Sequence, residues 1–251
     1  MKKNILLVYC LTLLFASTIQ AADNSFGNLF EQANIAYTRA EYQQAINHYL
    51  TVAGKDGVSA PLLYNLANSY AANEQTGEAV INYERALRLS PGDADIQANL
   101  MQVRKDAGLY RDDKPLYERL AELLEADQWL MLSGAAFLLL AITTLAATLV
   151  NKFTPAMTRL IIIGSLLVIM TTLPAVLFRY QSWNDGVVVG QEARLLISPF
   201  PEAASTGTIK AGRLVRPGKK HGDFVLVQDE TGRNGWLDQE NSKWIAELPS
   251  N

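Results

Sequence analysis

The stretch APLLYNLANSYAANEQTGEAVINYERALRLSPGD, residues 60–93, decides the fold of the N-terminal half of the chain. Three small or aromatic residues of the preceding segment return 34 positions later: Ala33 as Ala67, Ala45 as Ala79, and Tyr49 as Tyr83. A period of this length indicates stacked pairs of helices, in which small residues allow close approach and aromatic residues fill the space between pairs. Pro91 predicts the end of the second helix, because proline cannot continue one.

Residues 60–93 resemble the tetratricopeptide repeat, a helix-turn-helix unit that stacks into solenoids. They carry its small, aromatic and proline positions, with Leu63 where tryptophan is usual. Residues 26–59 form a weaker first repeat, and a partial third unit that begins at Ala94 is predicted to cap the stack. The resemblance implies a short α-solenoid in which the first helix of each repeat lines a concave groove.

Amide side chains recur with the same period on these first helices: Asn34 and Asn68, Asn65 and Asn99, and Asn68 and Gln102. In tetratricopeptide domains that grip extended peptides, such asparagines bond to the peptide main chain, since a carboxamide can donate and accept. By this resemblance the candidate peptide-binding groove contains Asn34, Asn65, Asn68, Asn99, Gln102, Tyr37 and Tyr64. Phe30 and Tyr64 replace the lysine that clamps a C-terminal carboxylate, so no carboxylate clamp is predicted. The alternative is that the amides lie on a solvated helix face or bridge one repeat to the next.

Two runs without charged residues, 129–150 and 160–178, predict a transmembrane helical hairpin. The first run would reach about 33 Å, enough to cross a hydrocarbon core of about 30 Å. The alternative is a pair of buried helices in a soluble core. The connecting loop, 151–159, carries Lys152 and Arg159, which predicts that this loop is cytoplasmic and that both flanking regions lie outside.

The N-terminal residues have the three regions of a secretory signal peptide: Lys2 and Lys3, an apolar run, and small residues up to Ala21. Cleavage after Ala21 and retention as an uncleaved anchor both remain open, and in either case the next segment is exported. This agrees with a cytoplasmic loop 151–159. The sequence therefore predicts a bacterial inner-membrane protein with its other domains in the periplasm.

A leucine stripe precedes the first apolar run and predicts an amphipathic helix next to the membrane. Leu116, Leu120, Leu123 and Leu124 share one face, with acidic and basic residues between them. The acidic polar face disfavours an electrostatic membrane anchor. We therefore expect this segment to be a bent connection that sets the orientation of the repeats relative to the bilayer.

After Gly186 the pattern changes to short alternating runs broken by glycine and proline, which predicts a small all-β domain. The predicted strands are 187–189, 193–197, 208–210, 213–215, 224–227 and 235–237. Their order and the Gly232-Arg233-Asn234-Gly235-Trp236 turn resemble bacterial SH3-like barrels. The resemblance implies structural roles for Gly232, Gly235 and Trp236, with Trp236 packed against the barrel. It also implies binding of peptides or cell-wall glycopeptide, and the alternative for Trp236 is a ligand contact.

Composition excludes several classes of function. The net charge is −3 and no segment is basic enough to follow a phosphate backbone, which excludes nucleic-acid partners. The chain has one cysteine, Cys10, and two histidines, His48 and His221, in patterns that match no metal site or nucleophile with its base. We therefore expect no catalytic residue, no metal and no cofactor, and predict that the protein is not an enzyme.

The expected fold class combines a tetratricopeptide α-solenoid, a transmembrane helical hairpin and an SH3-like β-barrel. The predicted segments are a signal peptide at 1–21, two repeats at 26–93, capping and juxtamembrane helices at 94–126, the spans 129–150 and 160–178, and the barrel at 187–248. This order resembles the BatE proteins of bacterial aerotolerance operons. The resemblance implies an adaptor that assembles an envelope complex with membrane-anchored von Willebrand factor A proteins. The competing hypothesis is an SH3-led sensor of peptidoglycan, in which the repeats act as a spacer.

Overall fold

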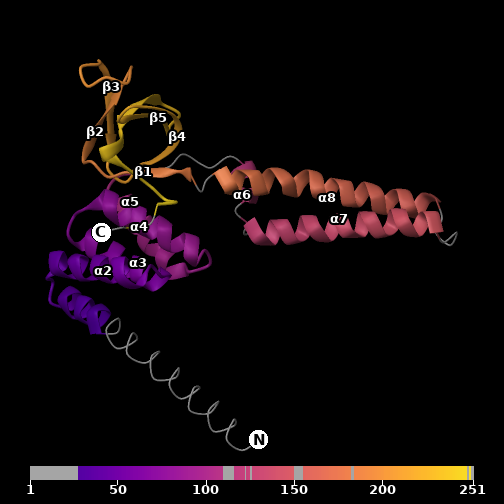
Figure 1. Ribbon diagram of the computed structural model, residues 1–251, viewed down its shortest axis with the longest axis horizontal. Helices are drawn as coiled ribbons and strands as arrows, with labels where there is room; N and C mark the ends of the chain where they lie inside the picture. The colour runs from indigo at the N-terminus through magenta and orange to yellow at the C-terminus, as the bar shows by residue number, and fades with distance from the viewer. Residues whose placement is uncertain are drawn as a thin grey trace, which may run out of the picture. The chain divides into compact units, whose positions relative to one another are not determined.

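In the computed structural model the described residues are 28–109, 116–121, 123–124, 126–149, 155–181, 184–247 and 249. They divide into two compact units. One contains the N-terminal helices and the strands of the C-terminal sheet, and the other contains three helices from the middle of the chain (Figure 1). The helical repeats, the two long apolar helices and the C-terminal sheet confirm the expected fold class. The predicted signal peptide, 1–21, lies outside the described residues.

The first unit begins with a series of helices joined by short turns (Figure 1). Its helices are a first one described over 28–38, then α2 (Tyr42–Asp56), α3 (Ala60–Ala72), α4 (Thr76–Leu89) and α5 (Ala94–Asp106). Local sequence sets several boundaries. Ser59 caps α3 by accepting a hydrogen bond from the Leu62 N–H at 3.3 Å, and Asp93 caps α5 by accepting from the Ile96 N–H at 3.2 Å. The helix α4 ends at Leu89, before Pro91.

The repeating small and aromatic residues form the core of the helices, as the 34-residue period predicts. The four repeating alanines are completely buried: Ala33, Ala45, Ala67 and Ala79. The two repeating tyrosines, Tyr49 and Tyr83, are each 1% exposed and count among the largest fully buried side chains. Small residues therefore bring the helices together, and the tyrosines fill the space that remains.

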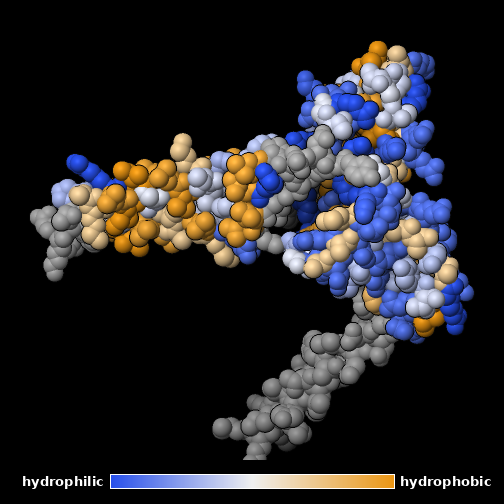
Figure 2. All heavy atoms as spheres, turned by 180° about the vertical axis from the view of Figure 1, so that it is seen from behind, coloured by the Kyte–Doolittle hydropathy of each residue, from blue (hydrophilic) through white to orange (hydrophobic). Residues whose placement is uncertain are grey.

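The second unit is dominated by two long apolar helices, α7 (Ala126–Leu149) and α8 (Pro155–Gln181), which pack side by side (Figure 1). The segments Asp127–Ala147 and Pro155–Phe178 are long and apolar enough to cross a membrane. Only 11% and 17% of their most apolar windows is buried, and Figure 2 shows apolar side chains along the surface of the hairpin. This exposure favours a membrane hairpin over the alternative of two helices buried in a soluble core.

The start of α8 differs from the prediction. The helix begins at Pro155 rather than at residue 160, because proline is well suited to a first helical position. Arg159 therefore lies in the first turns of α8 and not in the connecting loop. Between the helices the buried Thr172 forms a hydroxyl–hydroxyl hydrogen bond with Ser133 at 2.5 Å.

The predicted amphipathic segment is shorter than the leucine stripe suggests. It forms α6 (Leu116–Ala121), and Leu123 and Leu124 follow it in a turn. The ring of Tyr117 packs edge-on against Phe178 of α8 at 5.8 Å between centroids, and the Trp129 indole donates to the Ala121 carbonyl at 3.0 Å. These contacts join α6 to both long helices.

The C-terminal residues form one seven-stranded antiparallel sheet in the order β3-β2-β6-β5-β4-β1-β7. The strands are β1 (Gly186–Val188), β2 (Glu192–Leu196), β3 (Ser205–Lys210), β4 (Leu214–His221), β5 (Phe224–Asp229), β6 (Asn234–Asp238) and β7 (Ser242–Trp244). The last strand was not predicted, because it has three residues and follows the short 3₁₀ turn Gln239–Asn241. The sheet is curled but open, with β3 and β7 as its edges (Figure 1).

Glycines of the predicted turn hold β6 close to its neighbours, whereas Trp236 lies differently from the prediction. A Cβ atom on Gly235 would lie 2.4 Å from Leu195 Cγ, so only glycine fits there, and Gly232 adopts φ +82° in the turn. Leu237 is completely buried in the sheet core. Because neighbouring residues of a strand face opposite sides, Trp236 is only half-buried and its ring meets His221 instead.

Within the first unit the sheet is fused to the helices through a shared hydrophobic core. Val187 of β1 and Ile245 after β7 are buried in the same cluster as the cores of the helices. The guanidinium of Arg85 on α4, a residue 5% exposed, donates from Nη2 to the Trp244 carbonyl at 3.0 Å. Beside it, Lys243 and Glu78 form an ion pair at 2.7 Å. The repeats and the sheet, which the two long apolar helices separate in the sequence, are therefore parts of one compact unit.

Candidate functional site

The predicted groove asparagines lie on the first helices of successive repeats and are all half-buried. Asn34 lies on the helix at 28–38, Asn65 and Asn68 on α3, and Asn99 on α5. Residues three apart on a helix share a face, so Asn65 and Asn68 point to the same side of α3. The other side of α3 carries leucines that are buried in the core, which leaves the amides at its open edge.

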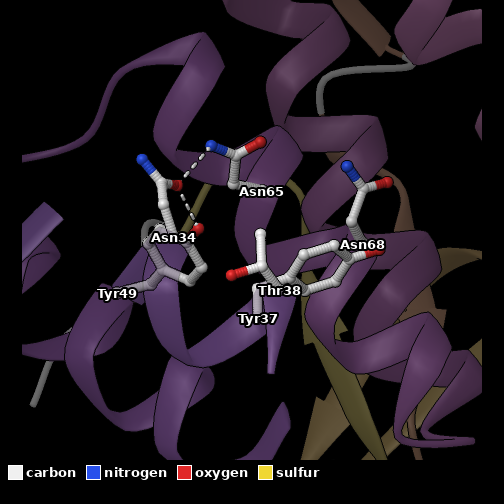
Figure 3. A pocket seen from close by; sticks show the side chains of 6 residues that line it. All are labelled: Asn34, Tyr37, Thr38, Tyr49, Asn65 and Asn68. Carbon is white, nitrogen blue, oxygen red and sulfur yellow. Dashed lines mark hydrogen bonds between the residues drawn. The ribbon is translucent and has the colours of Figure 1, made fainter. Parts of the chain in front are cut away.

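Asn34, Tyr49 and Asn65 are joined by hydrogen bonds that meet at one oxygen, and we call this set the first amide triad. The Tyr49 hydroxyl donates to Asn34 Oδ1 at 2.6 Å, and Asn65 Nδ2 donates to the same oxygen at 3.3 Å (Figure 3). The triad therefore connects both helices of the first repeat to the first helix of the second.

A second amide triad, Asn68, Tyr83 and Asn99, repeats this arrangement 34 residues further on. The Tyr83 hydroxyl donates to Asn68 Oδ1, and Asn99 Nδ2 donates to that oxygen at 3.0 Å. Asn99 Nδ2 also donates to the Tyr64 hydroxyl at 2.9 Å. In both triads the amides therefore bridge one repeat to the next, as the alternative interpretation of these residues predicted. Each asparagine nevertheless keeps one side-chain polar atom that takes no part in the bridge.

An open pocket of about 130 Å³ lies against the first triad. It is lined by Asn34, Tyr37, Thr38, Tyr49, Asn65 and Asn68 (Figure 3). Four of the predicted groove residues therefore meet in one place. None of the six lining side chains is charged, so the groups that the pocket offers are amides, hydroxyls and aromatic rings.

The remaining predicted groove residues lie outside the lining of this pocket. Asn99 belongs to the second triad, and the half-buried Tyr64 packs its ring edge-on against Tyr83 at 6.1 Å between centroids. Gln102 is exposed and donates from Nε2 to Asp106 Oδ1 at 2.7 Å. Sequence reasoning missed two lining residues: Thr38, whose only signal is its position one helical turn after Asn34, and Tyr49, which was interpreted only as a packing residue of the repeat.

Burial keeps the tyrosine hydroxyls of the triads neutral. It raises the pKa of Tyr49 to about 12, with a smaller contribution from neighbouring Tyr37, and raises the pKa of Tyr83 above its usual range. A tyrosine is protonated at physiological pH even without this shift, and burial extends the neutral form to alkaline pH, so each hydroxyl can donate to its asparagine.

A second candidate surface lies on the sheet. The rings of Phe200, His221 and Trp236 follow one another, with centroids 5.9 Å and 6.4 Å apart. Phe200 is 55% exposed and nearby Ile197 is 61% exposed. The half-buried Trp236 of β6 thus belongs to a row of three aromatic rings, which we call the aromatic surface.

Among the described residues, no group of three or more histidine, cysteine, aspartate or glutamate side chains is placed to hold a metal ion. His48 lies on α2 beside Gln44, at 3.4 Å between side-chain nitrogens. The site is therefore built from amides, hydroxyls and aromatic rings.

Comparison with known families supports the helical part of this description. The family model of the tetratricopeptide repeat matches residues 60–93, which cover α3, the following turn and α4. A search of curated proteins finds no match to the chain. The repeat predicted from the 34-residue period is confirmed, and tetratricopeptide repeats are a scaffold for protein–protein interaction.

Proposed function

We propose that the protein is a non-enzymatic adaptor of the bacterial inner membrane that binds extended segments of partner proteins in the groove of its repeats. The observation that carries this proposal is the pair of amide triads, because the first borders an open pocket and both keep polar atoms that no other described residue bonds to. A main chain supplies the donors and acceptors that such amides need.

The membrane location rests on α7 and α8, and the orientation rests on Lys152 and Arg159 together with the signal-peptide pattern. In this arrangement the repeats and the sheet face the periplasm. Tethering the groove to the bilayer raises its effective concentration toward other membrane proteins, so that weak binding is sufficient to assemble a complex.

The resemblance to BatE proteins supports a complex of the aerotolerance or stress type, with membrane-anchored von Willebrand factor A proteins as partners. The SH3-like pattern of the sheet is part of the same resemblance. An adaptor of this kind holds its partners together, and this role requires no reactive group.

The test is a crosslinking pulldown of the full chain from membranes, compared with the double variant Asn65→Ala and Asn68→Ala. We expect membrane partners to be lost from the variant while the protein stays folded, with a lower thermal unfolding midpoint because the buried Tyr83 hydroxyl loses its acceptor. The matched control is Gln44→Ala with Asn47→Ala, since these are exposed amides of α2 outside the groove. Retention of every partner by the groove variant would exclude groove-based assembly.

The aromatic surface favours a second candidate function, the binding of peptidoglycan by the sheet. Exposed rings such as Phe200 stack on sugar rings or peptide side chains without any catalytic group. Cosedimentation of the full chain with purified sacculi, against the variant Phe200→Ala with Trp236→Ala, tests it. Equal cosedimentation of both forms would exclude this function.

A further inference from the structure

The two amide triads leave a defined set of polar atoms unused. Asn34 Oδ1 receives two donors, whereas Asn34 Nδ2 donates to no group in the described part of the chain. Asn65 donates from Nδ2 to Asn34 Oδ1, and its own Oδ1 receives no donor from the described residues. The first triad therefore offers one donor, from Asn34, and one acceptor, from Asn65.

Tyr49 decides which atom of Asn34 is left over. A carboxamide can rotate by half a turn at little cost unless its neighbours distinguish oxygen from nitrogen. Tyr49 is 1% exposed, and its hydroxyl donates to the oxygen of Asn34 at 2.6 Å. Rotating Asn34 alone would place its Nδ2 against the Tyr49 hydroxyl and break this hydrogen bond, which is unfavourable for a buried polar group.

Tyr83 acts on Asn68 in the same way one repeat later. Its hydroxyl and Asn99 Nδ2 both donate to Asn68 Oδ1, so Asn68 Nδ2 and Asn99 Oδ1 are left over. Along the stack the leftover atoms alternate as donor, acceptor, donor and acceptor.

This alternation matches the main chain of an extended peptide. A residue in an extended strand presents its own N–H and C=O to the same side. One triad can therefore receive both groups of one peptide residue, the C=O on the amide nitrogen and the N–H on the amide oxygen. The uncharged pocket lining adds no requirement for a charged partner side chain.

We propose that Tyr49 and Tyr83 are positioning residues that orient Asn34 and Asn68, so that each repeat presents one donor and one acceptor to the main chain of an extended partner. The proposal rests on the proposed function of the groove. It assigns to the tyrosines a role in binding beyond their packing in the helical core.

The probe is the partner segment that a photoreactive amino acid in place of Thr38 crosslinks in membranes, prepared as a synthetic peptide. Its affinity is measured for the full chain in detergent. The variant Tyr49→Phe with Tyr83→Phe keeps both buried rings and removes both hydroxyls. We expect it to bind the peptide about tenfold more weakly, which is about 1.4 kcal/mol, because Asn34 and Asn68 are then no longer held in one orientation.

A second variant, Asn34→Asp with Asn68→Asp, separates orientation from packing. An aspartate still accepts from the tyrosine and the bridging asparagine, but it has no nitrogen to donate to the partner. We expect it to lose peptide binding by at least the same factor with an unchanged unfolding midpoint. N-methylation of the peptide residue at a triad, which removes its N–H, should weaken binding more than replacing that residue's side chain.

The outcomes separate the two proposals. Wild-type affinity in the aspartate variant overturns the positioning role, and so does wild-type affinity in a folded phenylalanine variant. If Asn65→Ala with Asn68→Ala still abolishes binding in those cases, the groove function stands without the tyrosines. Failure of any segment to crosslink at residue 38 overturns both proposals.

Discussion

Gly77 tests whether the sheet is docked on the repeats. This residue is buried near the start of α4, and a Cβ atom at this position would lie 2.6 Å from Val189 Cα and 2.7 Å from the Val188 carbonyl oxygen. Both are backbone atoms of the segment that runs through β1, so no flexible side chain can move aside. The variant Gly77→Ala must therefore push the sheet away from α4.

The magnitude follows from two opposing effects. Alanine in place of glycine stabilises a helix by at most about 1 kcal/mol, and overpacking a closely packed interface costs about 1–3 kcal/mol. Because the clash is with backbone, we expect the upper part of that range and a net loss of about 2 kcal/mol. For a unit of this size the loss corresponds to a fall of about 4–8 °C in the unfolding midpoint.

The assay is thermal unfolding of the full chain in detergent micelles, combined with hydrogen exchange of the amides of β1 and β7. The expected result is a lower midpoint and faster exchange in both strands. Gly92→Ala is the matched control, because a Cβ atom there meets nothing within 4 Å. A midpoint for Gly77→Ala equal to or above that of the original chain would refute docking of the sheet on α4.

Three further predictions concern the other parts of the fold. Burial raises the pKa of Tyr49 and of Tyr70 to about 12, against about 10 when unfolded, so stability is complete below pH 10 and falls as the pH rises to about 12. Tyrosinate absorbance followed together with unfolding should show the two events coinciding; ionisation well before unfolding would contradict this. Thr172→Val removes the hydroxyl that meets Ser133 and should weaken the hairpin by about 0.6–1.7 kcal/mol in mixed-micelle unfolding, with Thr172→Ser as the control. Gly235→Ala would place a Cβ atom 2.4 Å from Leu195 Cγ and should destabilise the sheet by about 1–3 kcal/mol in thermal unfolding; an unchanged midpoint would show that β6 can move.

The helices were predictable because the signals that form them are local. Alanines repeating every 34 residues mark the close contacts of the stack, and Pro91 marks where α4 must end. Charge-free runs of sufficient length predict α7 and α8 for the same reason. The predicted start of α8 was five residues too late. The charge-free run begins after Arg159, whereas the helix begins at Pro155, which suits a first helical position.

The candidate site was predictable in its residues and less so in its connections. The period of 34 identified Asn34, Asn65, Asn68 and Asn99, but not that buried tyrosines bond to two of them. A helical pattern shows which side chains share a face and says nothing about which of their atoms meet a neighbour from another repeat. Trp236 illustrates the same limit in the sheet, because the glycine turn predicted a packed ring and the strand turns it toward His221.

By itself the sequence determined the order of the parts: helical repeats, two long apolar helices and a small set of strands. Only the tertiary structure decided that the strands complete the core of the repeats, through Val187, Ile245 and the bond from Arg85 to Trp244 across 159 positions. Periodicity and hydropathy are properties of neighbouring residues, so they specify each element. Contacts between distant segments depend on the path of the whole chain, and no local pattern encodes that path.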